Sequence, residues 1–102
     1  MKLTQASLRI ERQLQDGGNI FRLRAPLRVE IAEEDGMWHC ESTPFGILAA
    51  GSSQEDALRS FAADFAVLWE EIAQAPDAEL TPDAIRLKYQ LRRIVESVDV
   101  AA

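Results

Sequence analysis

The stretch 44–58 constrains the fold of this chain more than any other. Within it, residues 47–50 form a short apolar run between two glycines, which predicts a buried strand. We expect Gly51 to adopt a positive φ where this strand gives way to a helix. Ser52 and Ser53 each have an acidic residue three positions on, a spacing typical of a capped helix start. The stretch therefore predicts a strand, a turn and a helix in succession.

The residues after this stretch predict a long amphipathic helix, because apolar positions recur at steps of three and four. A helix with one broad apolar face must bury that face against another element. Since the preceding strands are half apolar, we expect a sheet to cover it. The pair Ala75-Pro76 is expected to end the helix, since the residue before a proline avoids helical dihedral angles. The apolar positions are Leu58, Phe61, Phe65, Leu68 and Ile72, with Ala62 and Trp69 beside them.

Two alternating runs near the N-terminus predict a β-hairpin. In residues 7–14 polar and apolar side chains alternate, and we expect Leu8, Ile10 and Leu14 to share one side of a strand. A helix is the alternative for this run, because some of its apolar residues also fit one helical face. The Asp-Gly-Gly-Asn turn and the second alternating run, residues 20–24, favour the hairpin.

Three further strands are predicted between Leu27 and Ala50. The first presents alternate apolar residues and is followed by an Asp-Gly turn, which favours a tight hairpin. On the returning strand we expect Trp38 and Cys40 to face away from His39. Pro26 lacks an amide hydrogen and is expected to mark a break in strand pairing or an edge position.

Residues 81–98 predict a second helix. Thr81 suits the N-cap, Pro82 the first helical position, and Asp83 the positive end of the helix dipole. This helix either packs on the same domain or occupies the groove of a partner. Its apolar stripe is Ala84, Leu87, Leu91, Ile94 and Val98.

The predicted fold class is therefore α+β, in a single domain of residues 1–102. We expect an antiparallel sheet of three core strands plus an N-terminal hairpin. One long helix packs on a face of this sheet, and a second helix follows at the C-terminus.

Composition narrows the class of protein. Apolar residues make up 47% of the 102 residues, enough for a hydrophobic core. The uncharged apolar runs are far shorter than a membrane span requires, and the N-terminus lacks the apolar core of a signal peptide. Cys40 is the only cysteine and can form no disulfide within the chain, so we expect a cytoplasmic protein.

Charge is distributed unevenly along the chain, whose net charge is −6. Residues 1–28 hold six basic and two acidic side chains, whereas residues 29–102 hold five basic and fifteen acidic ones. An acidic body repels a phosphate backbone and favours a basic partner. The simpler interpretation is that charged side chains keep a small domain soluble.

No residue pattern predicts catalysis, a cofactor or a metal site. His39 and Cys40 are neighbours that point to opposite faces of a strand, and the chain has no second histidine or cysteine. A zinc site of four ligands is therefore not expected from one chain. The acidic run 30–35 could suggest a metal-dependent hydrolase, but solvated charge at a strand end and its turn is the simpler interpretation. We expect a protein that is not an enzyme and holds no cofactor.

Several residues of the central region match the pattern of a known family. They are Asp35-Gly36, Pro44, Gly46, Gly51 and Ser53-Gln54-Glu55-Asp56-Ala57-Leu58. With these residues the chain resembles the HicB family, the antitoxin half of HicA–HicB toxin–antitoxin pairs. Members of that family typically run strand, acidic-Gly turn, strand, proline-glycine loop, strand, and then G-x-T-x-E-E-A-L at the start of a long helix. The match covers about residues 27–72, with Ser53 in place of the usual threonine.

The resemblance implies a degenerate RNase H-like fold, with three antiparallel strands and a helix across one face. It also implies a homo-oligomer and an acidic surface that covers a small basic RNA-cleaving toxin. A stand-alone HicB-like protein with another partner is the alternative. DNA binding is not expected, because residues 76–102 are too short for the helix-turn-helix domain of many family members. Candidate contacts with a protein partner are Glu30, Glu33, Glu34, Asp35 and Trp38.

A second hypothesis is a small nucleic-acid-binding protein. A two-stranded ribbon can enter a major groove of DNA. The acidic body of the chain and the absence of aromatic residues interleaved with the N-terminal arginines argue against this class. The residues it would use are Arg9, Arg22, Arg24 and Arg28.

Overall fold

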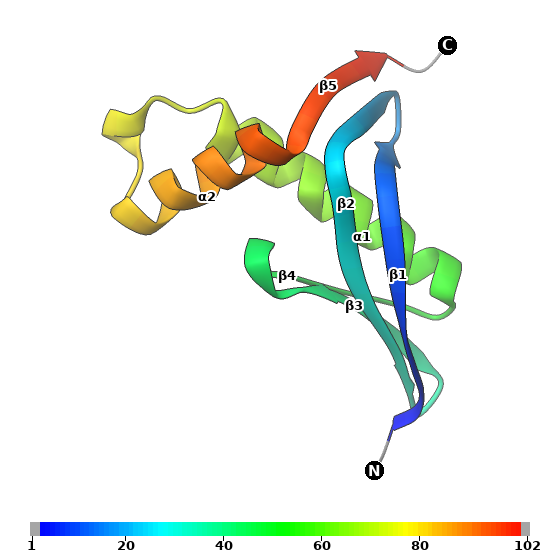
Figure 1. The fold of residues 1–102 in the computed structure, drawn as a ribbon. Helices are drawn as coiled ribbons and strands as arrows, with labels where there is room; N and C mark the ends of the chain where they lie inside the picture. The colour runs from blue at the N-terminus through cyan, green and yellow to red at the C-terminus, as the bar shows by residue number, and fades with distance from the viewer. Residues whose placement is uncertain (1–2, 101–102) are drawn as a thin grey trace.

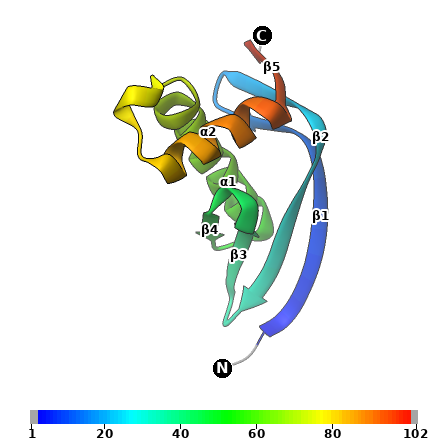
Figure 2. The ribbon, with the colours of Figure 1, turned by 60° about the vertical axis from the view of Figure 1, so that its left-hand side comes forward.

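The computed structural model describes the backbone of residues 3–100 and the side chains of residues 7–100. Within these residues, five strands form one antiparallel sheet, and two helices lie on the same side of it (Figures 1 and 2). The strands are β1 (Leu3–Asp16), β2 (Asn19–Glu34), β3 (Met37–Ser42), β4 (Ile47–Gly51) and β5 (Val95–Val100). The helices are α1 (Gln54–Leu68) and α2 (Pro82–Ile94). Shorter helical turns occupy Thr43–Phe45, Trp69–Ala73 and Asp77–Glu79. This arrangement confirms the predicted α+β class.

Both predicted β-turns are present. Gly17, with φ of 56°, begins the turn that joins β1 to β2. Asp35 and Gly36, with φ of 53° and 79°, join β2 to β3. Two successive residues with positive φ match the right-handed twist of the flanking strands, and this explains the Asp-Gly sequence at this turn.

The strand β2 organises the sheet, because it pairs along both of its edges. One edge pairs with β1, and the other pairs with β5 over residues 19–23 and with β3 over residues 30–34. Pro26 lies between these two segments, where the register with β1 also shifts. The proline therefore breaks the pairing as predicted. The strand nevertheless continues through it, so the N-terminal hairpin and the core strands share one sheet.

The prediction that Leu14 shares a face with Leu8 and Ile10 is wrong. Between Glu11 and Gln13 the register with β2 shifts, so that one residue of β1 faces four residues of β2 (23–26), and the alternation of β1 reverses beyond this point. Leu14 is consequently buried at 6% exposure, whereas Leu8 and Ile10 lie on the opposite face, 45% and 50% exposed.

The hydrophobic core lies between α1 and the sheet. The predicted apolar positions Phe61 and Phe65 are fully buried, which confirms the covered face of α1. The Phe65 ring makes edge contacts with Phe21 of β2 and with Phe45, at centroid distances of 5.5 and 5.9 Å. Beyond Leu68 the helix widens into a π-helical turn that ends at Ala73, before the predicted Ala75-Pro76 stop.

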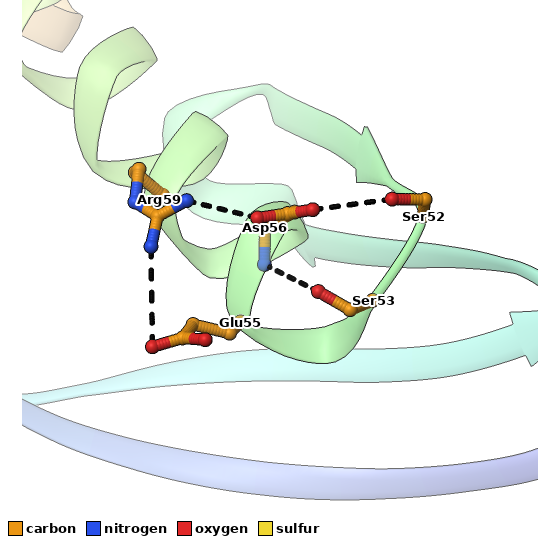
Figure 3. Close-up of polar contacts among 5 residues, drawn as sticks. All are labelled: Ser52, Ser53, Glu55, Asp56 and Arg59. Carbon is orange, nitrogen blue, oxygen red and sulfur yellow. Dashed lines mark hydrogen bonds and ion pairs between the residues drawn. The ribbon is translucent and has the colours of Figure 1, made fainter.

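The start of α1 is held by the predicted serine pair (Figure 3). The Ser53 hydroxyl accepts a hydrogen bond from the Asp56 amide at 3.0 Å, so Ser53 is the N-cap. Ser52 instead donates to the Asp56 carboxylate at 3.1 Å, and Arg59 binds the other oxygen of that carboxylate at 2.8 Å. The positive φ predicted for Gly51 is wrong, because among the described glycines only residues 17, 36 and 46 have one.

Replacing Ser53 with alanine is expected to lower the free energy of unfolding by about 1 kcal/mol, because the Asp56 amide loses its hydrogen-bond acceptor. Urea-induced unfolding followed by circular dichroism measures this loss. Ser52→Ala is the matched control, since its hydroxyl bonds only a side chain near the surface and a smaller loss is expected. Equal losses for the two variants would contradict the assignment of the cap.

The C-terminal helix is shorter than predicted. Thr81 caps α2 as expected, accepting a hydrogen bond from the Ala84 amide at 3.2 Å. The helix ends at Ile94, however, and Val98 lies in β5 instead of on the helical stripe. The alternation of valines with polar residues after Ile94 suits a strand, and Arg24 of β2 donates to the Arg93 and Val95 carbonyl oxygens at 3.1 and 3.4 Å. These bonds satisfy the end of α2 where β5 begins.

Candidate interaction surface

The face of the sheet turned away from the helices carries a row of four side chains, one from each of β1 to β4. Strand register places Leu8 opposite Glu30, Glu30 opposite Glu41, and Glu41 opposite Leu48. We call these four residues the open-face row. All four side chains are exposed. Two carboxylates therefore lie side by side at the centre of this face, with a leucine at each end.

An open hollow of about 710 Å³ lies over the open-face row. Its lining outside the row includes Arg28, Ala32, Glu34 and His39. The exposed fractions of Leu8, Ile10 and Leu48 are 45%, 50% and 65%. These apolar side chains flank the two carboxylates, and exposed apolar surface beside polar side chains is a mark of interaction sites.

The predicted acidic contacts divide between the two faces of the sheet. Glu30 and Glu34 lie on the open face beside the hollow, and Asp35 is exposed in the adjacent turn. Glu33 pairs with Trp38, and the Trp38 side chain packs against the core on the helix-covered face. The structure therefore brings together three of the five predicted residues and separates Glu33 and Trp38 from them.

The four arginines proposed for nucleic acid do not form one patch. Arg9 binds Glu11 at 3.1 Å, on the face of β1 opposite to Leu8. Arg22 pairs with Asp99 of β5, and Arg24 donates to backbone carbonyl groups as described above. Among the side chains that the structure describes, Arg28 alone of the four has no hydrogen bond or ion pair. Three of these arginines therefore have partners within the chain.

The nucleophilic and metal-binding side chains are also separated. Cys40 is fully buried, and this burial raises the pKa of its thiol. His39 lies on the open face beside the hollow. Within the described residues, no three His, Cys, Asp or Glu side chains are grouped so that they could hold a metal ion. The side chains around the hollow include apolar and acidic ones and, at Arg28 and His39, basic ones.

The polar flank of α2 binds the connector between the two helices. Lys88 donates to the Ala75 carbonyl oxygen at 2.6 Å and to the Asp77 carboxylate at 2.7 Å, and Tyr89 donates to the same carboxylate at 3.0 Å. These donors lower the pKa of Asp77. One turn after Lys88 on the same helix, Leu91 is fully buried. Of the two interpretations of this helix, the structure supports packing within the same domain.

Comparison of the chain with protein-family models, with curated proteins and with solved structures finds no match. In residues 3–100, no helix is long and apolar enough to cross a membrane.

Proposed function

We propose that this chain is a non-catalytic protein that binds a basic protein through the open face of its sheet. The observation that carries the proposal is the pairing of Glu30 with Glu41 at the centre of the open-face row. Like charges directly opposite one another on a sheet are destabilising. The fold itself does not need this pair, and such local conflicts are expected where a surface serves binding.

A basic partner fits the chemistry of the row. Two adjacent carboxylates accept the paired N–H groups of an arginine, and this hydrogen bonding offsets their mutual repulsion. Leu8 and Leu48 then provide apolar contact on either side. The acidic excess of residues 29–102 would also steer a basic partner toward this surface.

The specific version of the proposal is an antitoxin that neutralises a small basic RNA-cleaving toxin. This version rests on the sequence resemblance to the HicB family. A HicB-like protein that binds another basic partner is the alternative. The two differ in whether a small basic protein with RNA-cleaving activity is encoded beside this chain.

Coexpression with the product of the adjacent gene tests the proposal, which expects this product to be a small basic protein. We expect a complex that copurifies and that is lost when Glu30 and Glu41 are both replaced by lysine. The matched control replaces Glu70 and Glu71 by lysine, which changes the net charge equally on the helical side of the molecule. Equal binding by both variants would refute the open face as the contact. The absence of a basic neighbour would refute the antitoxin version.

Replacing Glu41 with glutamine is expected to raise the free energy of unfolding by about 0.5 kcal/mol, because the repulsion from Glu30 is removed. The same substitution should weaken binding of the basic partner. Urea unfolding and titration calorimetry measure the two effects separately. Glu96→Gln, at an exposed position of β5, is the control and should change neither quantity. A loss of stability on Glu41→Gln would contradict the repulsion between the two acids.

A further inference from the structure

The outer edge of β1 is the longest unpaired strand edge that the structure describes. β1 spans 14 residues and pairs with β2 along one side, and no described strand pairs with its other side (Figure 1). An exposed edge offers a row of backbone donors and acceptors to another strand. The exposed side chains of Leu8 and Ile10 lie next to this edge on the open face. Both the backbone and the side chains of this segment are therefore suited to strand pairing.

The charged side chains of this segment are complementary to those of a second, antiparallel copy of it. Arg9 and Glu11 flank Ile10 and lie on the same face of β1, where they form the 3.1 Å ion pair. In an antiparallel pair of identical strands with a two-fold axis at Ile10, each Arg9 lies opposite the second copy's Glu11. Ile10 then lies opposite Ile10 on the open face. Opposite charges at directly opposed positions stabilise such a pair.

Neighbouring registers are less favourable. An axis at Arg9 places two arginines opposite each other and an axis at Glu11 places two glutamates opposite each other, and both are repulsive. An axis at Leu8 places Arg9 opposite a serine and leaves it without an acidic neighbour across the strands. A two-fold axis midway between two residues would place a residue of one face opposite a residue of the other face. Regular strand pairing does not allow this, because directly opposed residues share a face. Charge therefore selects the register that is centred on Ile10.

We infer that the chain forms a two-fold homodimer by antiparallel pairing of β1 with β1, centred on Ile10. The two five-stranded sheets join into one, which covers the exposed edge of each copy. The open faces of both copies lie on the same side of the joined sheet. Of the open-face row only Leu8 lies on the newly paired strand, and it stays on the open face, so one dimer presents two open-face rows to partners.

Charge reversal tests this dimer. Sedimentation velocity at micromolar concentration and low salt should give a mass about twice 11.4 kDa for the natural sequence. Arg9→Glu and Glu11→Arg each place like charges opposite one another and should weaken the dimer about tenfold, whereas the double exchange should restore it. The double variant also keeps an ion pair within each chain, so circular dichroism should show an unchanged fold. A monomeric natural sequence, or equal dimerisation of all four proteins, would overturn the inference.

A single cysteine tests the register. Ile10→Cys should form a disulfide-linked dimer under mild oxidation, because the two Cβ atoms meet at the axis. Cys40 is fully buried and should not react. Ser7→Cys is the control and should stay unlinked, because the two copies of that residue lie several residues apart along the strands. Linkage through residue 7 and not through residue 10 would overturn the register.

Discussion

Replacing Gly51 with alanine is expected to destabilise the protein by about 3 kcal/mol or more. A Cβ at this position would lie 2.5 Å from the Ala57 amide nitrogen and 2.8 Å from the Asp56 carbonyl carbon. Both are backbone atoms of the first turn of α1, which the Ser53 cap holds in place. The added methyl group must therefore displace the helix from β4. Urea-induced unfolding measures the loss.

Gly46→Ala is the matched control. Gly46 has φ of 65°, but a Cβ built on it meets no atom within 4 Å. Alanine there suffers only the cost of the left-handed conformation, about 1–2 kcal/mol. A loss on Gly51→Ala that is no larger than the loss on Gly46→Ala would contradict the close approach of α1 to β4.

Replacing Phe65 with alanine is expected to destabilise the protein by about 3–5 kcal/mol. The side chain is fully buried and joins α1 to both Phe21 of β2 and Phe45 of the turn before β4. Alanine would leave a cavity at the point where these elements meet and remove both edge contacts between rings. Because a domain of this size is stable by only about 5–15 kcal/mol, the loss should be plain in urea unfolding.

Two controls separate the cavity from other effects. Phe65→Leu keeps most of the volume and should cost less than about 1.5 kcal/mol. Val67→Ala changes a half-exposed residue of the same helix and should have a still smaller effect. If Phe65→Ala destabilises no more than Phe65→Leu does, the core described here is wrong.

The sequence predicted the local elements well, because each is encoded by neighbouring residues. The two turns need glycine or Asp-Gly for their positive φ, and the apolar face of α1 follows from steps of three and four. Thr81 and one of the pair Ser52 and Ser53 were predicted as caps from their place before a helical pattern, and Ser53 and Thr81 accept the expected amide hydrogen bond.

The failures arise where a distant contact decides the conformation. The register shift between β1 and β2 after Glu11 reverses the face of Leu14, and nothing in the alternation of residues 7–14 reveals it. Val98 fits the helical stripe by spacing, but pairing of β5 with β2 makes it part of a strand. Gly51 was predicted to adopt a positive φ, which it does not have. Its role depends on how closely α1 approaches β4, which is a tertiary feature.

The candidate surface was only partly predictable. Glu30, Glu34 and Asp35 were found because they are close in sequence. Leu8, Glu41 and Leu48 were missed, because only the register across four strands brings them into line with Glu30. The alternation of side chains along each strand indicates which residues share a face. It does not indicate which residues of neighbouring strands lie opposite one another.

The central claim is that a basic protein binds the open face of the sheet. Its most direct test is a titration of the ¹⁵N-labelled chain with a small basic protein that copurifies with it or is encoded beside it, followed by amide chemical shifts. We predict that the largest changes occur at Leu8, Glu30, Glu41 and Leu48 and that the exposed face of α2 is unaffected. Changes confined to α1 and α2, with the open-face row unperturbed, would contradict the claim.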